Sequence, residues 1–196
     1  MSEILGLNYK QAIELVDKCI TDPVTKLHLK ETEAIMRALA KKFGEDEEVW
    51  GVIGLLHDID WNLVKGNEAE HCILAQSILK EAGASDFLVE SVVSHGYSNE
   101  SIPKLLDKKR TTKLQHCLVA AETLTGIIIA ATLVQPEKKL SNVSLPSLIK
   151  KFKSPSFAAR CNRDLVKECE EAGITLDDFL QIGLLALQGI SEELGL

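Results

Sequence analysis

The chain has 196 residues, which is enough for one domain with a substantial core and too few for two domains of ordinary size. Apolar residues make up 45% and charged residues 26% of the sequence, which is typical of a globular protein and excludes a disordered or collagen-like chain. The net charge of −7 lacks the basic excess of a duplex nucleic-acid binder, so we predict no binding to duplex nucleic acid.

The first residues, MSEILGLNYK, have no basic flank and no apolar run before a cleavage site, so we expect no export signal. The longest strongly apolar stretch, residues 123–134, is about half of the ~20 residues that a bilayer crossing requires. We therefore expect no membrane span and a cytoplasmic location. An odd number of widely spaced cysteines without a CxxC pair favours free thiols in a reducing compartment: Cys19, Cys72, Cys117, Cys161 and Cys169.

Helical periodicity recurs along the chain, and no stretch alternates apolar and polar residues for long enough to indicate a sheet. We therefore predict an all-α, single-domain helical bundle. The first three helices are predicted over 9–19, 24–43 and 46–58. Gly44 suits a left-handed cap at the end of the second helix, and acidic residues complement the positive end of the third. The third helix is apolar nearly all round, which indicates burial between other helices.

The remaining helices are predicted on both sides of a loop-rich segment that begins at Pro136. They are predicted over 67–81, 85–95 and 111–134, and then over 145–152, 156–172 and 176–194. Ser85 and Thr175 are suitable N-cap residues. We divide the single domain, residues 1–196, into a core over 24–134 and a C-terminal helical extension over 135–196 that packs on this core.

Four of the five histidines are predicted to point into the core. His28 shares a stripe of the second helix with Ile35 and Leu39, at offsets of seven and eleven residues. His57 lies at the end of the most apolar helix, and the other two follow the apolar stripes of their own helices. The inward histidines are His28, His57, His71 and His95.

Two acidic residues also occupy inward positions: Asp58, next to His57, and Glu122, on a stripe with Leu118 and Ile129. A buried carboxylate without a partner is costly, and a buried imidazole needs a partner for each nitrogen, so a metal ion would satisfy both kinds of group. Core histidines bonded to backbone carbonyls are the alternative, which explains any one of them more easily than the whole set. Nitrogen and oxygen donors without sulfur favour Fe, Mn, Zn, Co or Ni over Mg.

Two further polar residues are left out of this set. His116 precedes Glu122 by six residues, about 240° of rotation on a helix, so the two side chains leave the helix in different directions. Asp60 lies two residues after Asp58 and would point away from it if the helix continued. We expect Asp60 to cap the loop that follows, over 60–62.

The ordered set resembles the signature of the HD superfamily of metal-dependent phosphohydrolases, in which an early His, an adjacent His-Asp pair and a late Asp are carried on helices. Here the match is His28, then His57-Asp58 in LLHDID, then Glu122 in LVAAETLTG. The chain departs from the signature at Glu122, where the family has Asp. The additional methylene displaces the carboxylate, so this position could alter the geometry or the metal preference of the site.

The resemblance implies a metal site with one or two ions. One ion would be held by His28, His57, Asp58 and Glu122. Two further histidines of the binuclear members are matched in order by His71 and His95, and Asp58 would then bridge both ions. The residues expected to act in catalysis are Asp58, His71 and His95. With a single ion, the two histidines would instead contact the phosphate or protonate the leaving group.

The activity that the resemblance implies is hydrolysis of a small phosphoester, with a nucleotide as one candidate, by a water that divalent ions activate. Two other classes stay open: an HD-type di-iron oxygenase, and a non-catalytic sensor of a metal or nucleotide. The small phosphorylated substrate is the partner we expect, and the apolar helices are compatible with a homodimer. Basic residues could add charge for an anionic substrate, although a solvated helix face is the simpler interpretation: Lys150, Lys151, Lys153, Arg160 and Arg163.

Overall fold

The computed structural model describes the backbone from Ser2 to Leu196 and the side chains from Ile4 onward. Every regular element in this range is a helix, so the predicted all-α fold class is confirmed. The helices are α1 (Ser2–Leu5), α2 (Tyr9–Cys19), α3 (Pro23–Phe43), α4 (Glu47–Leu56), α5 (Trp61–Val64), α6 (Ile73–Glu81), α7 (Asp86–Val93), α8 (Lys113–Leu133), α9 (Leu145–Phe152), α10 (Arg163–Lys167), α11 (Leu176–Gly189) and α12 (Ser191–Leu194). Short 3-10 turns are η1 (Glu68–Glu70), η2 (Ser94–Gly96), η3 (Pro103–Leu105) and η4 (Leu140–Asn142).

The closest packing in the core joins α3 and α4. The Asp22 side chain caps α3, and Gly44 ends it with a left-handed φ of 72°. All of α4 from Val49 to Leu56 is buried. A Cβ atom at Gly54 would lie only 3.0 Å from the backbone oxygen of Thr32, so the absence of a side chain there lets the two helices approach closely. This packing places the end of α4 beside the first turns of α3.

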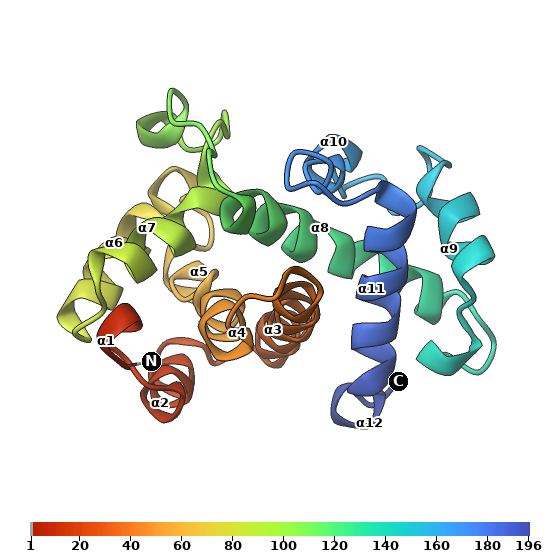
Figure 1. The fold of residues 1–196 in the computed structure, drawn as a ribbon, viewed down its shortest axis with the longest axis horizontal. Helices are drawn as coiled ribbons and strands as arrows, with labels where there is room; N and C mark the ends of the chain where they lie inside the picture. The colour runs from red at the N-terminus through yellow and green to blue at the C-terminus, as the bar shows by residue number, and fades with distance from the viewer. Residues whose placement is uncertain (1) are drawn as a thin grey trace.

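The long helix α8 connects the two parts of the molecule, crossing behind α11 toward α9 (Figure 1). It begins with a capping box between Thr112 and Gln115, and it packs against α3, α10, α9 and α11. By length and composition alone α8 could cross a membrane, but 67% of its most apolar window is buried inside the protein. Its apolar character is therefore explained by contacts within the fold.

The C-terminal elements lie against the core through α11, which contacts both α3 and α8 (Figure 1). Gly183 of α11 makes a close approach possible, since a Cβ atom there would lie 2.6 Å from a methyl carbon of Leu124. The Gln188 side chain donates hydrogen bonds to the backbone oxygens of Leu140 and Val143. These contacts join α11 to η4.

The helix predicted over 156–172 is wrong, because only α10 forms within it. The Arg163 guanidinium donates to five backbone carbonyls at the end of α9 and in the loop that follows it, those of Phe152, Ser154, Phe157, Ala158 and Cys161. One charged side chain thus satisfies carbonyls that a helix would have paired along its own backbone. The segment consequently folds as a series of turns that wraps over α8.

The helix predicted over 67–81 is also wrong at its beginning. The chain forms the short turn η1 and then breaks at Cys72, whose φ is 64°, before α6 begins at Ile73. A left-handed conformation is unfavourable for a residue with a Cβ atom, so tertiary contacts must impose this break. The break leaves His71 outside both η1 and α6.

Candidate metal centre

Four histidines and one aspartate from separate elements converge at one end of the bundle. His28 lies in the second turn of α3, while His57 and Asp58 directly follow α4. His71 lies between η1 and α6, and His95 lies in η2 at the end of α7. The positions of His28, His57 and Asp58 are thus set by helices, and those of His71 and His95 by short turns.

The imidazoles form two pairs that face each other through their Nε2 atoms. The Nε2 atoms of His28 and His57 are 3.1 Å apart, and those of His71 and His95 are 3.0 Å apart. Asp58 lies between the pairs. Its Oδ1 atom is 3.3 Å from both Nε2 atoms of the second pair, and its Oδ2 atom is 3.8 Å and 3.6 Å from those of the first.

The other nitrogen of each ring has an acceptor of its own. The Nδ1 atom of His57 lies 2.8 Å from the Gly54 backbone oxygen, and that of His95 lies 2.6 Å from the Val92 oxygen. The Nδ1 atom of His71 lies 2.9 Å from Oδ1 of Asp60. In a neutral ring, each of these contacts places the proton on Nδ1 and leaves the Nε2 lone pair directed at its partner.

His28 follows the same rule through a hydroxyl group. The Thr125 hydroxyl donates to the backbone oxygen of Glu122 at 2.7 Å, so its oxygen is free to accept from Nδ1 of His28 at 3.1 Å. When all four rings are neutral, therefore, two nitrogen lone pairs face each other in each pair. Such contacts are repulsive unless a cation lies between the nitrogens.

This donor set fits a divalent metal ion. Two nitrogens bound at about 2.0–2.1 Å to one ion lie about 2.9 to 3.4 Å apart, depending on octahedral or tetrahedral geometry, and both observed separations are within that range. Among the described residues, two groups of potential ligand atoms lie within 4.8 Å of one another. They are His28, His57 and Asp58, and His71, Cys72 and His95.

Burial and neighbouring groups shift the pKa values of His57 and Asp58 at the centre of the site. Burial lowers the pKa of His57 to about 3, although Asp58 acts to raise it, so this fully enclosed ring is neutral near pH 7. Burial alone would raise the pKa of Asp58, but His57 and the second imidazole pair lower that pKa well below its usual value. A neutral imidazole and an ionised carboxylate are the forms that bind metals.

Asp60 has a different role from the predicted loop cap, and that prediction is wrong. Its side chain makes no cap at α5 and is fully buried. One carboxylate oxygen accepts from His71, and the other accepts at 3.0 Å from the backbone amide of Ala75 in the first turn of α6. Asp60 therefore orients His71 and caps α6 from a distance, which replaces the local cap that Cys72 does not supply.

Glu122 lines the same cavity but stands apart from the two ligand groups. Its Oε1 atom accepts a hydrogen bond of 2.7 Å from the hydroxyl of the neighbouring Thr123. Burial raises the pKa of its carboxyl group, against the influence of His95 and His28. Its assignment as a ligand of the first ion stays a prediction, and in this arrangement its backbone oxygen contributes to the site by anchoring Thr125.

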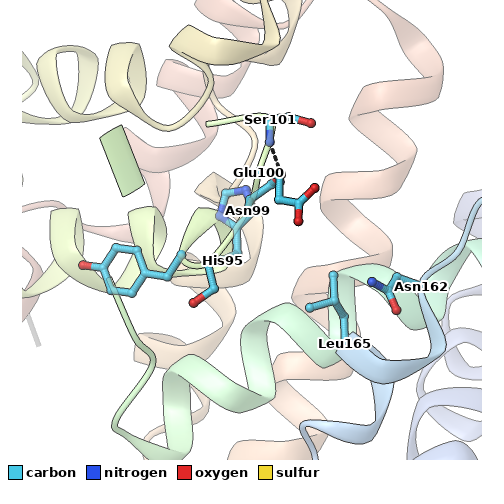
Figure 2. A pocket seen from close by; sticks show the side chains of 8 residues that line it. His95, Asn99, Glu100, Ser101, Asn162 and Leu165 are labelled. Atoms are coloured by element: carbon cyan, nitrogen blue, oxygen red, sulfur yellow. Dashed lines mark hydrogen bonds between the residues drawn. The ribbon is translucent and has the colours of Figure 1, made fainter. Parts of the chain in front are cut away.

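Asp58 and three of the converging histidines, His28, His71 and His95, line a cavity of about 500 Å³ whose far wall comes from the C-terminal extension, at 160–162 and Leu165. A second cavity of about 500 Å³ adjoins it and shares His95, Asn99, Asn162 and Leu165. Figure 2 shows Asn99, Glu100 and Ser101 on one side of this space and Asn162 and Leu165 on the other. The site thus lies between the core and the extension.

The basic residues predicted to face the substrate separate into two groups. Arg160 lines the metal cavity, whereas Arg163 is occupied by the loop carbonyls described above. The lysines at 150, 151 and 153 line neither cavity. Arg160 is thus the predicted basic residue that lines the same cavity as Asp58 and the converging histidines.

One comparison with known proteins bears on this site. The HD domain family matches residues 26–127, slightly more than half of the chain, and this range holds all of the converging histidines and Asp58. Neither the curated proteins nor the solved structures contain a match to the chain.

Proposed function

Because this chain belongs to the HD domain family, a family of metal-dependent hydrolase type, we propose that it is a phosphohydrolase acting on a small phosphoester. The observation that carries the proposal is the position of Asp58 between two facing imidazole pairs. A carboxylate with one oxygen toward each pair suits a pair of ions that share it. Under this proposal His28 and His57 hold one ion, and His71 and His95 hold the other.

When bound, divalent ions here would lower the pKa of a water and offset negative charge on the phosphoryl oxygens. The chain supplies the geometry. Asp58 sets the spacing of the two halves, and the bonds at Nδ1 keep each imidazole aimed at its partner. If a single ion is held by the first pair, His71 and His95 remain within the cavity to contact the phosphate or to protonate the leaving group.

The surroundings favour a small anionic substrate with a polar body. Arg160 provides a planar cationic group that suits the oxygens of a phosphate. The adjoining cavity carries hydroxyl, amide and carboxylate side chains, including those of Asn99, Ser101 and Asn162. These groups could bind hydroxyl or amine substituents of the organic part, and each cavity has the size of an ordinary small-molecule site.

The donor set also supports a choice of metal. Four imidazole nitrogens and one shared carboxylate are borderline ligands, whereas Mg²⁺ is held by oxygen ligands and retained waters. We therefore propose Fe, Mn, Zn, Co or Ni. Sulfur does not alter this choice, because Cys72 lies 3.5 Å from Nε2 and 4.0 Å from Nδ1 of His95, beside the ring and off the lone-pair direction of Nε2.

The central test is the replacement Asp58→Ala, with bound metal measured by mass spectrometry after loading with Mn²⁺ or Zn²⁺. We expect the variant to lose metal, because the change removes the carboxylate that faces the Nε2 atoms of both imidazole pairs. Asp107→Ala is the matched control, because this acidic residue is exposed and lies outside both cavities. Full metal content in Asp58→Ala would contradict the proposed ligands.

Activity is tested with a panel of phosphoesters and nucleotides against Mn, Fe, Co, Ni, Zn and Mg. We expect phosphate release with at least one of the borderline metals and little with Mg²⁺. Stoichiometric metal binding without turnover of any substrate would favour the sensor. Oxygen consumption by an iron-loaded sample without phosphoester hydrolysis would favour the oxygenase.

A further inference from the structure

The turn that carries His95 is held by one buried arginine. Arg110 has only 5% of its side chain exposed, and its Nη1 group donates to three backbone oxygens. The distances are 3.1 Å to Ser94, 3.4 Å to His95 and 2.7 Å to Tyr97. These carbonyls end α7 and η2, where helical partners run out, so the guanidinium supplies donors that the backbone lacks.

Arg110 is in turn held by Glu168, which immediately follows α10 in the C-terminal extension. The two carboxylate oxygens accept from Nε at 2.6 Å and from Nη2 at 2.5 Å, which is a bidentate ion pair. Nδ1 of His116 lies 2.9 Å from the same carboxylate. A histidine that sequence reasoning left outside the metal set therefore belongs to this network instead.

The network acts on the second imidazole pair and not on the first. His95 is fixed through its ring by Val92 and through its backbone by Arg110. His28 and His57 are anchored by Thr125 and Gly54, and the hydrogen bonds of Arg110 and Glu168 do not reach either ring. Loss of Glu168 would leave the buried guanidinium without its counter-charge, which is costly and favours its movement away from the three carbonyls.

We propose that Glu168 is a positioning residue, which acts through Arg110 to hold His95 in place for the second metal ion. Under this proposal, the C-terminal extension contributes a positioning residue to the second metal site. This inference rests on the proposed function, because it takes His71 and His95 as the ligands of a second ion. Glu168 lies 58 positions after Arg110 in the chain, outside the range 26–127 that matches the family.

The test is Glu168→Gln, a change that keeps the size of the side chain and removes its charge. Metal-free protein is titrated with Mn²⁺ by calorimetry, and the two binding phases are fitted separately. We expect the second ion to bind about 10- to 100-fold more weakly, as for other residues that orient a ligand, and the first ion to bind as in the parent. Glu171→Gln is the matched control, because it removes the same charge from an exposed site three residues away.

Arg110→Lys provides an independent variant, because lysine keeps the charge but cannot donate to the carboxylate and the carbonyls at once. We expect the same selective weakening. In the double variant, the loss of affinity for the second ion should be smaller than the two single losses combined, because both changes break one contact chain. Thermal melts of all variants establish that they fold.

Unchanged affinity for both ions in Glu168→Gln would overturn the inference and leave the proposed function intact. Equal weakening of both ions would also overturn it, since that pattern indicates general destabilisation. Failure of the parent chain to bind any Mn²⁺ or Zn²⁺ would overturn the proposed function together with the inference.

Discussion

The two imidazole pairs have almost the same internal geometry, with Nε2 separations of 3.1 Å and 3.0 Å, but they are supported in different ways. The first pair comes from α3 and the end of α4, two helices that pack closely along their length. The second comes from two short turns that depend on the buried side chains of Asp60 and Arg110. A similar site can thus be built from rigid helices or from turns held by charged groups.

This difference predicts a different response to loss of metal. A ligand present at about 1,000 times its Kd stabilises the native state by about 4 kcal/mol, so chelation should lower the melting temperature markedly. We expect hydrogen exchange to rise most in the turns around His71 and His95 and least in α3 and α4. An equal rise in all four regions would show that the two pairs are supported to the same degree.

Asp60→Ala is expected to weaken the second imidazole pair more than the first. The change leaves Nδ1 of His71 and the amide of Ala75 without their acceptor in a buried position. The second ion should bind about 100-fold more weakly, while the first is retained. Asp60→Asn keeps one acceptor oxygen, so its affinity for the second ion should lie between those of Asp60→Ala and the parent. Calorimetric titration with Mn²⁺ distinguishes these cases, and loss of the first ion alone would contradict the assignment.

The helical support of the first pair can be disturbed with Gly54→Ala. The new Cβ atom would lie 3.0 Å from both the Thr32 oxygen and a Met36 side-chain carbon, so α3 and α4 must separate slightly. We expect a loss of about 1–3 kcal/mol in the free energy of unfolding. Denaturant titration measures it. Gly189→Ala serves as control, because nothing lies within 4 Å of a Cβ atom at that position.

The smallest effect is expected from Thr125→Val, which removes the hydroxyl that anchors His28 and keeps the shape of the side chain. The first ion should bind about 10-fold more weakly, and the second should be unaffected. Together with Asp60→Ala, this variant tests whether the two halves of the site can be weakened independently. Weakening of the second ion by Thr125→Val would indicate that the halves are coupled through Asp58.

Much of the fold follows from local sequence signals. The helix over 145–152 and the caps at Gly44, Ser85 and Thr175 were predicted at the positions where the structure has them. The predictions failed over 67–81 and 156–172, where the periodicity is helical but the backbone is not. In both segments a distant or charged side chain takes hydrogen bonds that the helix would have made, and periodicity contains no information about such a competitor.

The candidate site was likewise predictable only in part from local sequence signals. Apolar stripes predicted that His28, His57, His71 and His95 point inward, and the adjacency of His57 and Asp58 needed no tertiary information. The assignment of Glu122 as a ligand is a prediction that the metal titrations can check. Asp60 was misassigned because the helix ends at Leu56, which changes the direction of every later side chain.

The sequence by itself therefore determined the helical class, the inward histidines and the likeness to a metal-dependent family, because these depend on the type and spacing of neighbouring residues. Only the tertiary structure decided which nitrogens face each other, what holds them, and that the C-terminal extension reaches the site through Glu168 and Arg110. These features depend on contacts between residues far apart in the chain, and a hydrogen bond across 58 positions leaves no periodic trace in the sequence.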